Sequence, residues 1–460
     1  MNVTSRLERT RPRRSSSLVA PRWLGFMLLA CACGGPRESS APAAPTPEPT
    51  KPAAEFHAPV DARAAEVAPV DASAVEVTPT ATPVPAELGA LEPATVERAN
   101  DFALKMLWEL EPQRDNLVLA PLTALVALEM LLPGARGKSA EQLRKALQID
   151  TTQALALIQT LRALTEQPGP RNELSLAHGL YAQKDLAIQP DYQTSLTSDF
   201  HASFASLDFQ QDVDAARTRI NGDVSTATRG KVAELLPVGT LPDNTVLVLT
   251  SALAMLGQWK EPFEVARTKT GSFTRAKKPA VEVPFMHRTG HYAVGKLGAA
   301  TLVELPYQGG GLSMLIVLPK ADARSLTKLS ATALRDATDS LVVHNVDLSL
   351  PRFRAKLPSA SLVPMLQKLG VRLLFGDSAD LSGIAGAPGQ LKVGVVRHGA
   401  FVAVDEHGTE AAGATVVGVS NRSRPPSVDV DHPFVFVIRA RESGLILFVG
   451  RIGDPSRADG

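Results

Sequence analysis

Cysteine, aromatic side chains and net charge are all scarce in this chain of 460 residues. Its two cysteines, Cys31 and Cys33, lie near the N-terminus, so the rest of the chain has neither a disulfide framework nor a cysteine-based metal site. Aromatic residues make up 5% of the chain and the formal net charge is +1, which argues against a nucleic-acid partner. A hydrophobic content of 44% is still enough for a large core. We therefore expect a globular domain that is held together by its core alone.

The N-terminus has the composition of an export signal. Six arginines, at positions 6, 9, 11, 13, 14 and 22, precede an apolar run over residues 23–30 that is too short to span a bilayer. The run ends in Leu28-Leu29-Ala30, directly before Cys31. This ending resembles a bacterial lipoprotein signal, in which residues 1–30 are removed and Cys31 is lipidated. Lipidation of Cys33 and an ordinary secretory signal remain as alternatives.

A lipid anchor and a long linker predict where the protein acts. Residues 31–93 are rich in proline and alanine, with a near-repeat of residues 58–67 at 68–77. Such a segment cannot bury enough apolar surface to fold, and at ~3 Å per residue it could reach well over 100 Å from a membrane. Ala32, which is not acidic, favours the outer membrane on its periplasmic or surface face. We expect an exported cell-envelope lipoprotein, or a secreted protein if the signal is an ordinary one.

Helix and strand patterns are mixed over residues 94–460, which form the predicted domain. Apolar residues at three- and four-residue spacing predict a helix over residues 99–110, and residues 152–164 are also predicted to be helical. Ser139 and Gln142 match a capping box that would open another helix. Strands are predicted at residues 174–182, 245–255, 301–319 (two strands) and 391–404, with a hairpin at 434–438 and 445–449. Because helices and strands do not alternate regularly, the fold class is α+β.

Motifs of enzymes and metal sites are missing. Residues 133–139 approach a phosphate-binding loop, but Leu132 stands where that motif needs its first glycine. The sequence has no Gly-x-Ser-x-Gly elbow and no His-Glu-x-x-His helix. Asp405 and Glu406 are adjacent, which in a strand sends them to opposite faces. We expect a protein that is not an enzyme and that needs neither a cofactor nor a metal.

Residues 406–426 combine small residues with an arginine that a protease could reach. If the first half became a strand, alternate residues would share one face, and all of them are small or β-branched: Thr409, Ala411, Gly413, Thr415 and Val417. Glu410 falls on the other face. This half could therefore enter a sheet without burying a charge.

The second half of the same stretch contains a candidate cleavage site. Arg422 is followed by the small residue Ser423, whereas Arg424 is followed by Pro425. A trypsin-like protease recognises the arginine guanidinium through a carboxylate in its specificity pocket. Arg422–Ser423 is therefore the predicted reactive bond.

Residues from about 94 to 455 resemble the serpin family. The early segment Asn116-Leu-Val-Leu-Ala-Pro-Leu-Thr123 is similar to the family's Asn-x-x-x-Ser-Pro-x-Ser, and it is followed by a loop similar to Gly-Ala-x-Gly-x-Thr. Each match is weak alone, but their order and spacing make the resemblance specific. The further matching segments are Trp259-Lys-Glu-Pro-Phe263, Leu305-Pro-Tyr307, Leu350-Pro-Arg-Phe353, His432-Pro-Phe434 and Phe448-Val-Gly-Arg451.

The resemblance implies three sheets, about nine helices and an exposed reactive loop. It places a loop hinge after Glu406, at Gly408, Thr409, Glu410, Ala411, Ala412, Gly413, Ala414 and Thr415. Arg422 is the sixteenth residue after Glu406, which is the inhibitory spacing. The positions that control sheet opening, known as shutter and breach, would be Thr123, Ser251, Trp259 and His398. The family normally has serine at Ala120 and asparagine at Ser251, so the hydrogen bonds around His398 are expected to differ.

The resemblance also implies an activity and a partner. We expect a monomeric, single-use inhibitor that forms a covalent acyl complex with a trypsin-like serine protease. The alternatives are a non-inhibitory serpin, acting as a substrate, carrier or surface-binding module, and an inhibitor of Arg-specific cysteine proteases. The region where some family members bind heparin, residues 151–164, has Arg162 as its one basic residue, so heparin binding is not implied.

Overall fold

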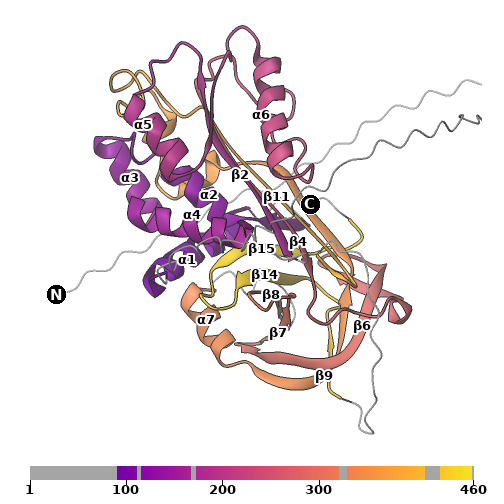
Figure 1. Ribbon diagram of the computed structural model, residues 1–460. Coiled ribbons are helices and arrows are strands. Elements are labelled where there is room, and N and C mark those ends of the chain that lie inside the picture. Colours follow the sequence, from indigo (N-terminus) through magenta and orange to yellow (C-terminus); the bar gives the residue numbers. More distant parts are fainter. Residues whose placement is uncertain (1–90, 111–114, 167–171, 321–328, 410–424, 458–460) are drawn as a thin grey trace, which may run out of the picture. The chain divides into compact units, whose positions relative to one another are not determined.

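The computed structural model describes residues 91–110, 115–166, 172–320, 329–409 and 425–457 (Figure 1). The predicted signal peptide, Cys31 and nearly all of the linker lie outside these residues, as do loop residues 410–424. The described part contains eight α-helices and fifteen strands, which confirms the α+β class. None of its helices combines the length and the apolar character that crossing a bilayer requires.

The helices begin where the sequence supplies a local reason. Asp212 caps α6 by accepting a hydrogen bond from the Ala215 N–H at 3.0 Å, and Pro121 occupies the first turn of α2, where its missing N–H costs nothing. The helices are α1 (Pro93–Leu110), α2 (Pro121–Glu129), α3 (Gly137–Leu147), α4 (Thr151–Glu166), α5 (Pro190–Thr194), α6 (Val213–Ala227), α7 (Ala331–Asp339) and α8 (Val363–Lys368).

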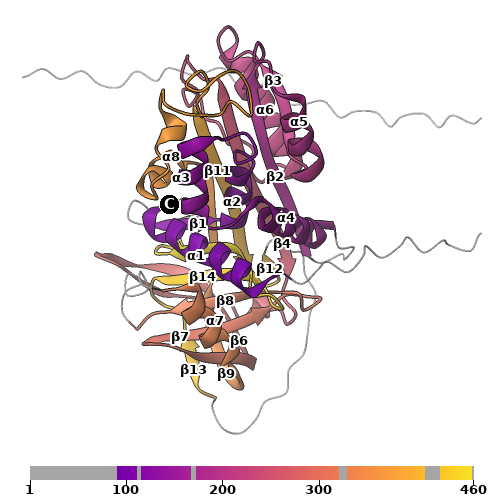
Figure 2. The same ribbon diagram turned by 90° about the vertical axis from the view of Figure 1, so that its left-hand side faces the viewer.

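A six-stranded sheet carries the segment of functional interest. Its order is β10 (Phe353–Ser361), β11 (Val395–Asp405), β12 (Gly408–Thr409), β4 (Leu247–Gln258), β2 (Asn172–Gln183) and β3 (Ser203–Leu207). Helix α6 packs on one face through a cluster that includes Ile220, Tyr181 and Val248. Helix α2 contacts β4, and the neighbouring β4 residues Leu249 and Leu253 are part of the main core. Both faces of the middle strands are therefore buried (Figure 2).

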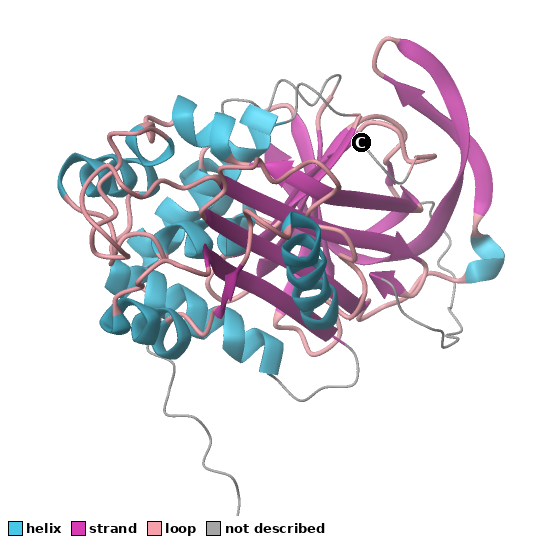
Figure 3. Ribbon diagram, turned by 90° about the horizontal axis from the view of Figure 1, so that it is seen from above, coloured by secondary structure: helices cyan, strands magenta, loops and turns pink. Residues whose placement is uncertain are grey.

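A second, nine-stranded sheet has the order β1 (Asn116–Leu119), β15 (Ile446–Ile452), β14 (Phe434–Ala440), β8 (Leu312–Leu318), β7 (Ala300–Pro306), β6 (Lys278–Leu297), β9 (Val342–Pro351) and β13 (Ser427–Asp429). Strand β5 (Lys269–Arg275) pairs with β6 off this path. The resemblance implied three sheets, but the 20-residue β6 pairs with β5, β7 and β9 and joins the remaining strands into one hydrogen-bonded network. Most helices lie at the left of Figure 3, and one helix lies across the strands near its centre.

Two predictions from local sequence pattern need correction. The capping box is wrong, because α3 starts at Gly137, and the Ser139 hydroxyl accepts a hydrogen bond from the Asp380 N–H at 3.0 Å instead. The predicted strand over residues 391–404 begins only at Val395 and ends at Asp405. The other predicted strands and the hairpin are confirmed to within a few residues of their ends.

One buried acid stands out in the core. All nine residues of α2 are buried, including Glu129 at its C-terminal end, and neither oxygen of the Glu129 carboxyl group has a hydrogen-bond partner. Burial raises its pKa to about 8, with a further increase from Asp150 and an opposing effect of Arg144. The Glu129 side chain is therefore protonated in the native state at neutral pH, whereas in an unfolded chain it is ionised.

We predict that Glu129→Gln flattens the pH dependence of stability. Because the native pKa lies above the unfolded value, the contribution of Glu129 to native stability is most favourable below about pH 4.5 and is lost as the pH rises through about 8. The neutral glutamine removes this loss, so the variant should exceed the wild type by roughly 4 kcal/mol at pH 8, with little difference at pH 4.5. Thermal unfolding between pH 4.5 and 9 measures this. Glu141→Gln, at an exposed site on α3, is the control, and parallel curves for all three proteins would contradict the prediction.

Candidate functional site

The candidate site is the place where the six-stranded sheet includes the first two described residues of the predicted loop hinge. Gly408 and Thr409, as β12, lie between the ends of β11 and β4 and pair antiparallel with both. Beyond β12 the two strands pair directly and parallel, from Val395 opposite Val248 to Phe401 opposite Ala254. The sheet is thus open by two residues at one end and closed along the rest of β4 and β11.

The open and closed parts of the sheet share one register. Across β12, Thr409 pairs with both Val404 and Gly257, and along the closed part Phe401 pairs with Ala254. In both places the β11 residue lies 147 positions after its β4 counterpart. A longer inserted strand therefore needs β4 and β11 to move apart but not to slide along each other.

Gly408 is at a position that only glycine fits. Its φ of +151° lies in a region that other residues rarely adopt. A Cβ atom there would meet the Gly257 carbonyl oxygen and lie 2.7 Å from the Gln258 Cα. The close approach of three strands at this point thus depends on the missing side chain.

Thr409 is held by an aromatic pair. Its side chain is completely buried, and its hydroxyl shares a hydrogen bond of 2.6 Å with the Tyr307 Oη. Tyr307 stacks on Trp259 at 4.6 Å between ring centroids, and Trp259 Nε1 donates to the Asp405 carbonyl at 3.0 Å. Burial raises the pKa of Tyr307, so its hydroxyl stays protonated. Trp259 therefore lies beside the inserted hinge, as the resemblance implied.

Glu406 fixes the turn that leads into β12. Its carboxylate is buried and accepts hydrogen bonds from Arg352, at 2.8 Å from Nε, and from the Thr268 hydroxyl. Burial alone would raise the pKa of Glu406, but the bonds from Arg352 and Thr268 outweigh it and hold this pKa below its usual value. The turn is therefore held by the ionised Glu406 carboxylate, which pairs with Arg352, the residue directly before β10.

His398 links the closed part of the sheet to α2. Its Nε2 accepts a hydrogen bond from the Ala120 backbone N–H at 3.1 Å, so Nδ1 carries the proton and donates to the Ser251 Oγ at 2.9 Å. Burial lowers the pKa of His398 to about 3, which keeps the ring neutral. Ser251 is also the residue directly opposite His398 in the β4–β11 pairing. The bond between them therefore holds β4 and β11 together.

The predicted shutter residues meet, although not all in the expected way. Ala120 lacks the hydroxyl of the family's serine, but its backbone supplies the donor to His398. The Thr123 hydroxyl, expected within this cluster, donates instead to the Ala120 carbonyl at 2.9 Å and so holds the start of α2. Sequence reasoning assigned no role to Tyr307 or Arg352, which appeared only as members of matching segments.

The rest of the predicted site lies outside the described residues. This applies to the reactive bond, Arg422–Ser423, to the lipidation site Cys31, and to the hinge residues Glu410, Ala411, Ala412, Gly413, Ala414 and Thr415. Among the described residues no group of His, Cys, Asp and Glu side chains is arranged to hold a metal ion.

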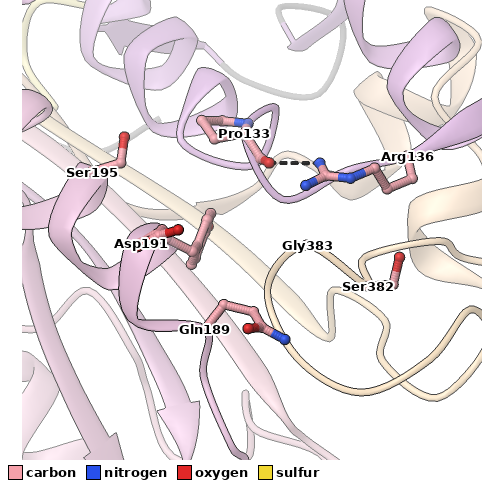
Figure 4. Close-up of a pocket in the computed structure, with 8 residues that line it drawn as sticks. Pro133, Arg136, Gln189, Asp191, Ser195, Ser382 and Gly383 are labelled. Carbon is pink, nitrogen blue, oxygen red and sulfur yellow. Dashed lines mark hydrogen bonds between the residues drawn. The ribbon is translucent and has the colours of Figure 1, made fainter.

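A separate pocket of about 320 Å³ lies near α2 and α5 (Figure 4). Its one arginine, Arg136, donates to the carbonyls of Pro133 and Ala135 at 2.7 and 2.9 Å, and its guanidinium lies so close to Gly383 that a side chain there would collide with it. The arginine thus holds the loop at Gly383 against the turn after α2. The lining residues are Pro133, Arg136, Gln189, Asp191, Tyr192, Ser195, Ser382 and Gly383.

Comparison with known proteins gives consistent matches to one family. Residues 97–455 match the family model described as "Serpin (serine protease inhibitor)". Leukocyte elastase inhibitor of Sus scrofa is 37% identical over 354 residues, which cover 74% of this chain and 93% of that protein.

Solved structures give the same result. Serpin48 of the insect Tenebrio molitor, described as a highly specific serpin, superposes with a TM-score of 0.70 at 29% identity and covers 78% of this chain and 98% of its own. Human thyroxine-binding globulin, solved with its hormone bound, superposes with a TM-score of 0.72 at 26% identity and covers 79% and 98%. Similar folds therefore include a protein whose name records ligand binding.

We predict that Gly408→Ala expels the hinge from the sheet. The new Cβ collides with backbone atoms of β4, which cannot move aside as a flexible side chain would. Amide hydrogen exchange at residues 408 and 409 should become at least about tenfold faster, since the pairing with β4 and β11 is lost. Gly311→Ala is the control, because a Cβ there meets nothing within 4 Å. Unchanged protection of these two amides would contradict the prediction.

Proposed function

Because the chain belongs to the serpin family of serine protease inhibitors, we propose that it is a single-use inhibitor that traps a trypsin-like serine protease. The observation that carries this proposal is the hinge. Gly408 and Thr409 are already paired between β11 and β4, in the register that a full strand would need. A loop that begins inside the sheet can continue into it once it is cut.

The trypsin-like specificity rests on the sequence of the loop. Arg422 offers a guanidinium to the carboxylate of the protease pocket, and Ser423 is small enough to leave the bond accessible. The protease serine adds to the Arg422 carbonyl carbon, and the bond to the Ser423 nitrogen breaks. The new amine takes a proton from the protease histidine, which leaves Arg422 esterified to the serine.

The register defines where each freed loop residue would go. Continued from β12, the inserted strand brings residues 411, 413, 415 and 417 opposite Met255, Leu253, Ser251 and Leu249 of β4, all of which are buried. On β11 the same residues come opposite Val402, Ala400, His398 and Val396. The face predicted from the sequence to be small and uncharged is therefore the one that would enter the core.

Thr415 has a special place in this register. It would lie between Ser251 and His398, at the point where these two residues now share a hydrogen bond. Opening the sheet breaks that bond and exposes two buried polar groups, which is costly. The Thr415 hydroxyl can accept from His398 Nδ1 and bond Ser251, so insertion replaces the interaction that it breaks.

Insertion explains how the protease would be trapped. The sixteen residues after Glu406, which end at Arg422, would carry the attached protease roughly 50 Å along the sheet at about 3.3 Å each. Pulling the protease against the inhibitor distorts its oxyanion hole, whose loss slows deacylation by about 10²–10³. The acyl bond then outlasts the encounter, and the inhibitor is consumed with its target.

A non-inhibitory role is the second candidate, because human thyroxine-binding globulin, whose name records the binding of thyroxine, shares the fold. In that case the protein would be cleaved as a substrate or would carry a ligand without trapping. An inhibitor of Arg-specific cysteine proteases would use the same loop and the same insertion. The hinge of small residues favours a trapping protein over a carrier.

We predict that the full chain forms a covalent complex with trypsin that survives boiling in detergent. Sequencing of the released peptide should place the cut after Arg422, and Arg422→Ala should lower the rate of complex formation by at least about a hundredfold, since the charge-paired specificity contact is lost. Cleavage after Arg422 without any covalent complex would reject the inhibitor in favour of a substrate.

We predict that Thr415→Asp converts the inhibitor into a substrate. The carboxylate would have to enter the core beside Ser251 and His398, so insertion should be slower than deacylation while cleavage after Arg422 keeps its rate. The yield of covalent complex should fall at least about tenfold, measured by gel densitometry. Glu410→Asp is the control, since residue 410 would face the partly exposed Leu256. Equal yields from both variants would refute this register.

We also propose that the mature chain is an exported lipoprotein, anchored through Cys31 with residues 31–93 as a spacer. The support is the apolar run that ends directly before Cys31 and the linker composition. In a bacterial host the wild type should incorporate labelled palmitate and sediment with membranes. Cys31→Ala should lose both properties, with Cys33→Ala as the control. Label that persists in Cys31→Ala but not in Cys33→Ala would move the anchor to Cys33.

A further inference from the structure

An exposed apolar strand edge lies beside β13, the strand that follows residues 410–424. Val342 and Val343, at the start of β9, are 56% and 62% exposed, and the following His344 and Asn345 are exposed as well. Strand β9 pairs with β6 on one side over its whole length. On its other side it pairs only with β13, and only at residues 347–349, among the described strands.

At the start of β9, which pairs with no described strand on this side, some backbone N–H and C=O groups face away from β6. The Asp347 N–H donates to the Pro426 carbonyl at 3.0 Å, and the Ser349 carbonyl accepts from the Val430 N–H at 2.9 Å. Because alternate residues of a strand direct their N–H and C=O groups to the same side, Val343 and Asn345 face this outer edge. They offer a row of donors and acceptors to another extended chain.

The residues directly before β13 limit its pairing with β9. The two residues before β13 are Pro425 and Pro426, which have no N–H groups. They cannot donate to β9, so the ladder that starts at Ser427 does not extend backward along Val343 and Asn345. Proteins usually protect an exposed edge with charges, but residues 340–346 contain no Asp, Glu, Lys or Arg.

The length of the loop determines what comes near this edge. Arg422 is five residues before Ser427, so the reactive bond is within about 17 Å of the β13–β9 pairing. Strands β13 and β9 are parallel, and Pro425 and Pro426 therefore enter from the end of β9 that carries Val342 and Val343. Val343 itself is about 13 Å from Asp347 along the strand.

A protease bound to Arg422 is large compared with these distances. A globular protease of about 200 residues has a radius of gyration of about 16 Å. Its surface on the Ser423 side of the cut is therefore large enough to reach the first four residues of β9. Among the described residues, this edge combines exposed apolar side chains with backbone groups that pair with no described strand.

We propose that Val342, Val343, His344 and Asn345 form a second docking site for the target protease, distinct from its contact with Arg422. An extended surface loop of the protease adds to the β9 edge at Val343 and Asn345, and apolar side chains of that loop cover the two valines, which lie on opposite faces of the sheet. The site increases affinity and selects among proteases that all accept arginine. This inference rests on the proposed function, because it takes the occupant to be the protease that cleaves at Arg422.

The test measures docking without catalysis. The full chain is titrated with trypsin whose catalytic serine has been replaced by alanine, and the dissociation constant is compared among variants. Val343→Lys places a charge on the apolar edge, and Val343→Pro removes the outward N–H. Val238→Lys is the matched control, since Val238 is 75% exposed and follows Leu236, which bonds to Asn221 of α6. Helix α6 and β9 lie far apart in Figures 1 and 2.

We expect binding at least tenfold weaker for Val343→Lys and for Val343→Pro, and within twofold of wild type for Val238→Lys. Melting temperatures equal to that of the wild type confirm folding, and if Val343→Pro does not fold, Val343→Lys decides alone. Equal affinities for wild type and Val343→Lys would overturn the docking site but leave the inhibitor intact. Self-association of the wild type that Val343→Lys abolishes, with protease binding unchanged, would assign the edge to a second copy and overturn the proposal too. No binding by the wild type would overturn the proposed function, and the docking site with it.

Discussion

The pairing between β4 and β11 is the constraint on which the rest of the structure depends. These strands are parallel neighbours, and the two residues of β12 show that an antiparallel strand fits between them without a change of register. An antiparallel strand can form hydrogen bonds to both of two parallel neighbours. The strands β4 and β11, which now pair with each other, could therefore separate and accept such a strand between them. The energetic question is how strongly the closed pairing resists separation.

Resistance to separation comes from a small polar group in an apolar core. The bond from His398 to Ser251 crosses the two strands, and the bond from Ala120 to His398 ties them to the start of α2. A neutral, fully buried imidazole must keep both partners or lose the free energy of an unsatisfied polar group. Opening is therefore costly until an incoming hydroxyl can take the place of Ser251. The start of helix α2 thus contacts the residue that holds the two strands together. The other end of the same helix lies in the core and carries the buried acid Glu129.

The described residues on the two sides of the predicted reactive loop differ in how their backbones pair with neighbouring strands. At the hinge end, a glycine and a buried threonine let the backbone join two strands at once, and the Tyr307–Trp259 pair holds it there. At the other end, two prolines stop the ladder at Ser427. In the proposed mechanism, the backbone at the first end continues into the six-stranded sheet, whereas the two prolines at the second end cannot donate hydrogen bonds to β9. Among the described strands, the start of β9 therefore has no partner on that side.

The sequence by itself determined the fold class, the period-two pattern of the hinge and the positions of Trp259 and His398, because these depend on local periodicity or on a family resemblance. Because residues 94–460 contain no cysteine, the sequence also excluded a disulfide within this part of the chain. Local pattern failed where a distant partner competes, as when Ser139 bonds Asp380 instead of capping its helix. Only the tertiary structure decided that Tyr307 holds Thr409, that Arg352 anchors Glu406, and that a backbone N–H replaces the missing serine hydroxyl at Ala120. These contacts join residues 54 to 278 positions apart, and their geometry follows from how the strands pack and not from any pattern within one segment.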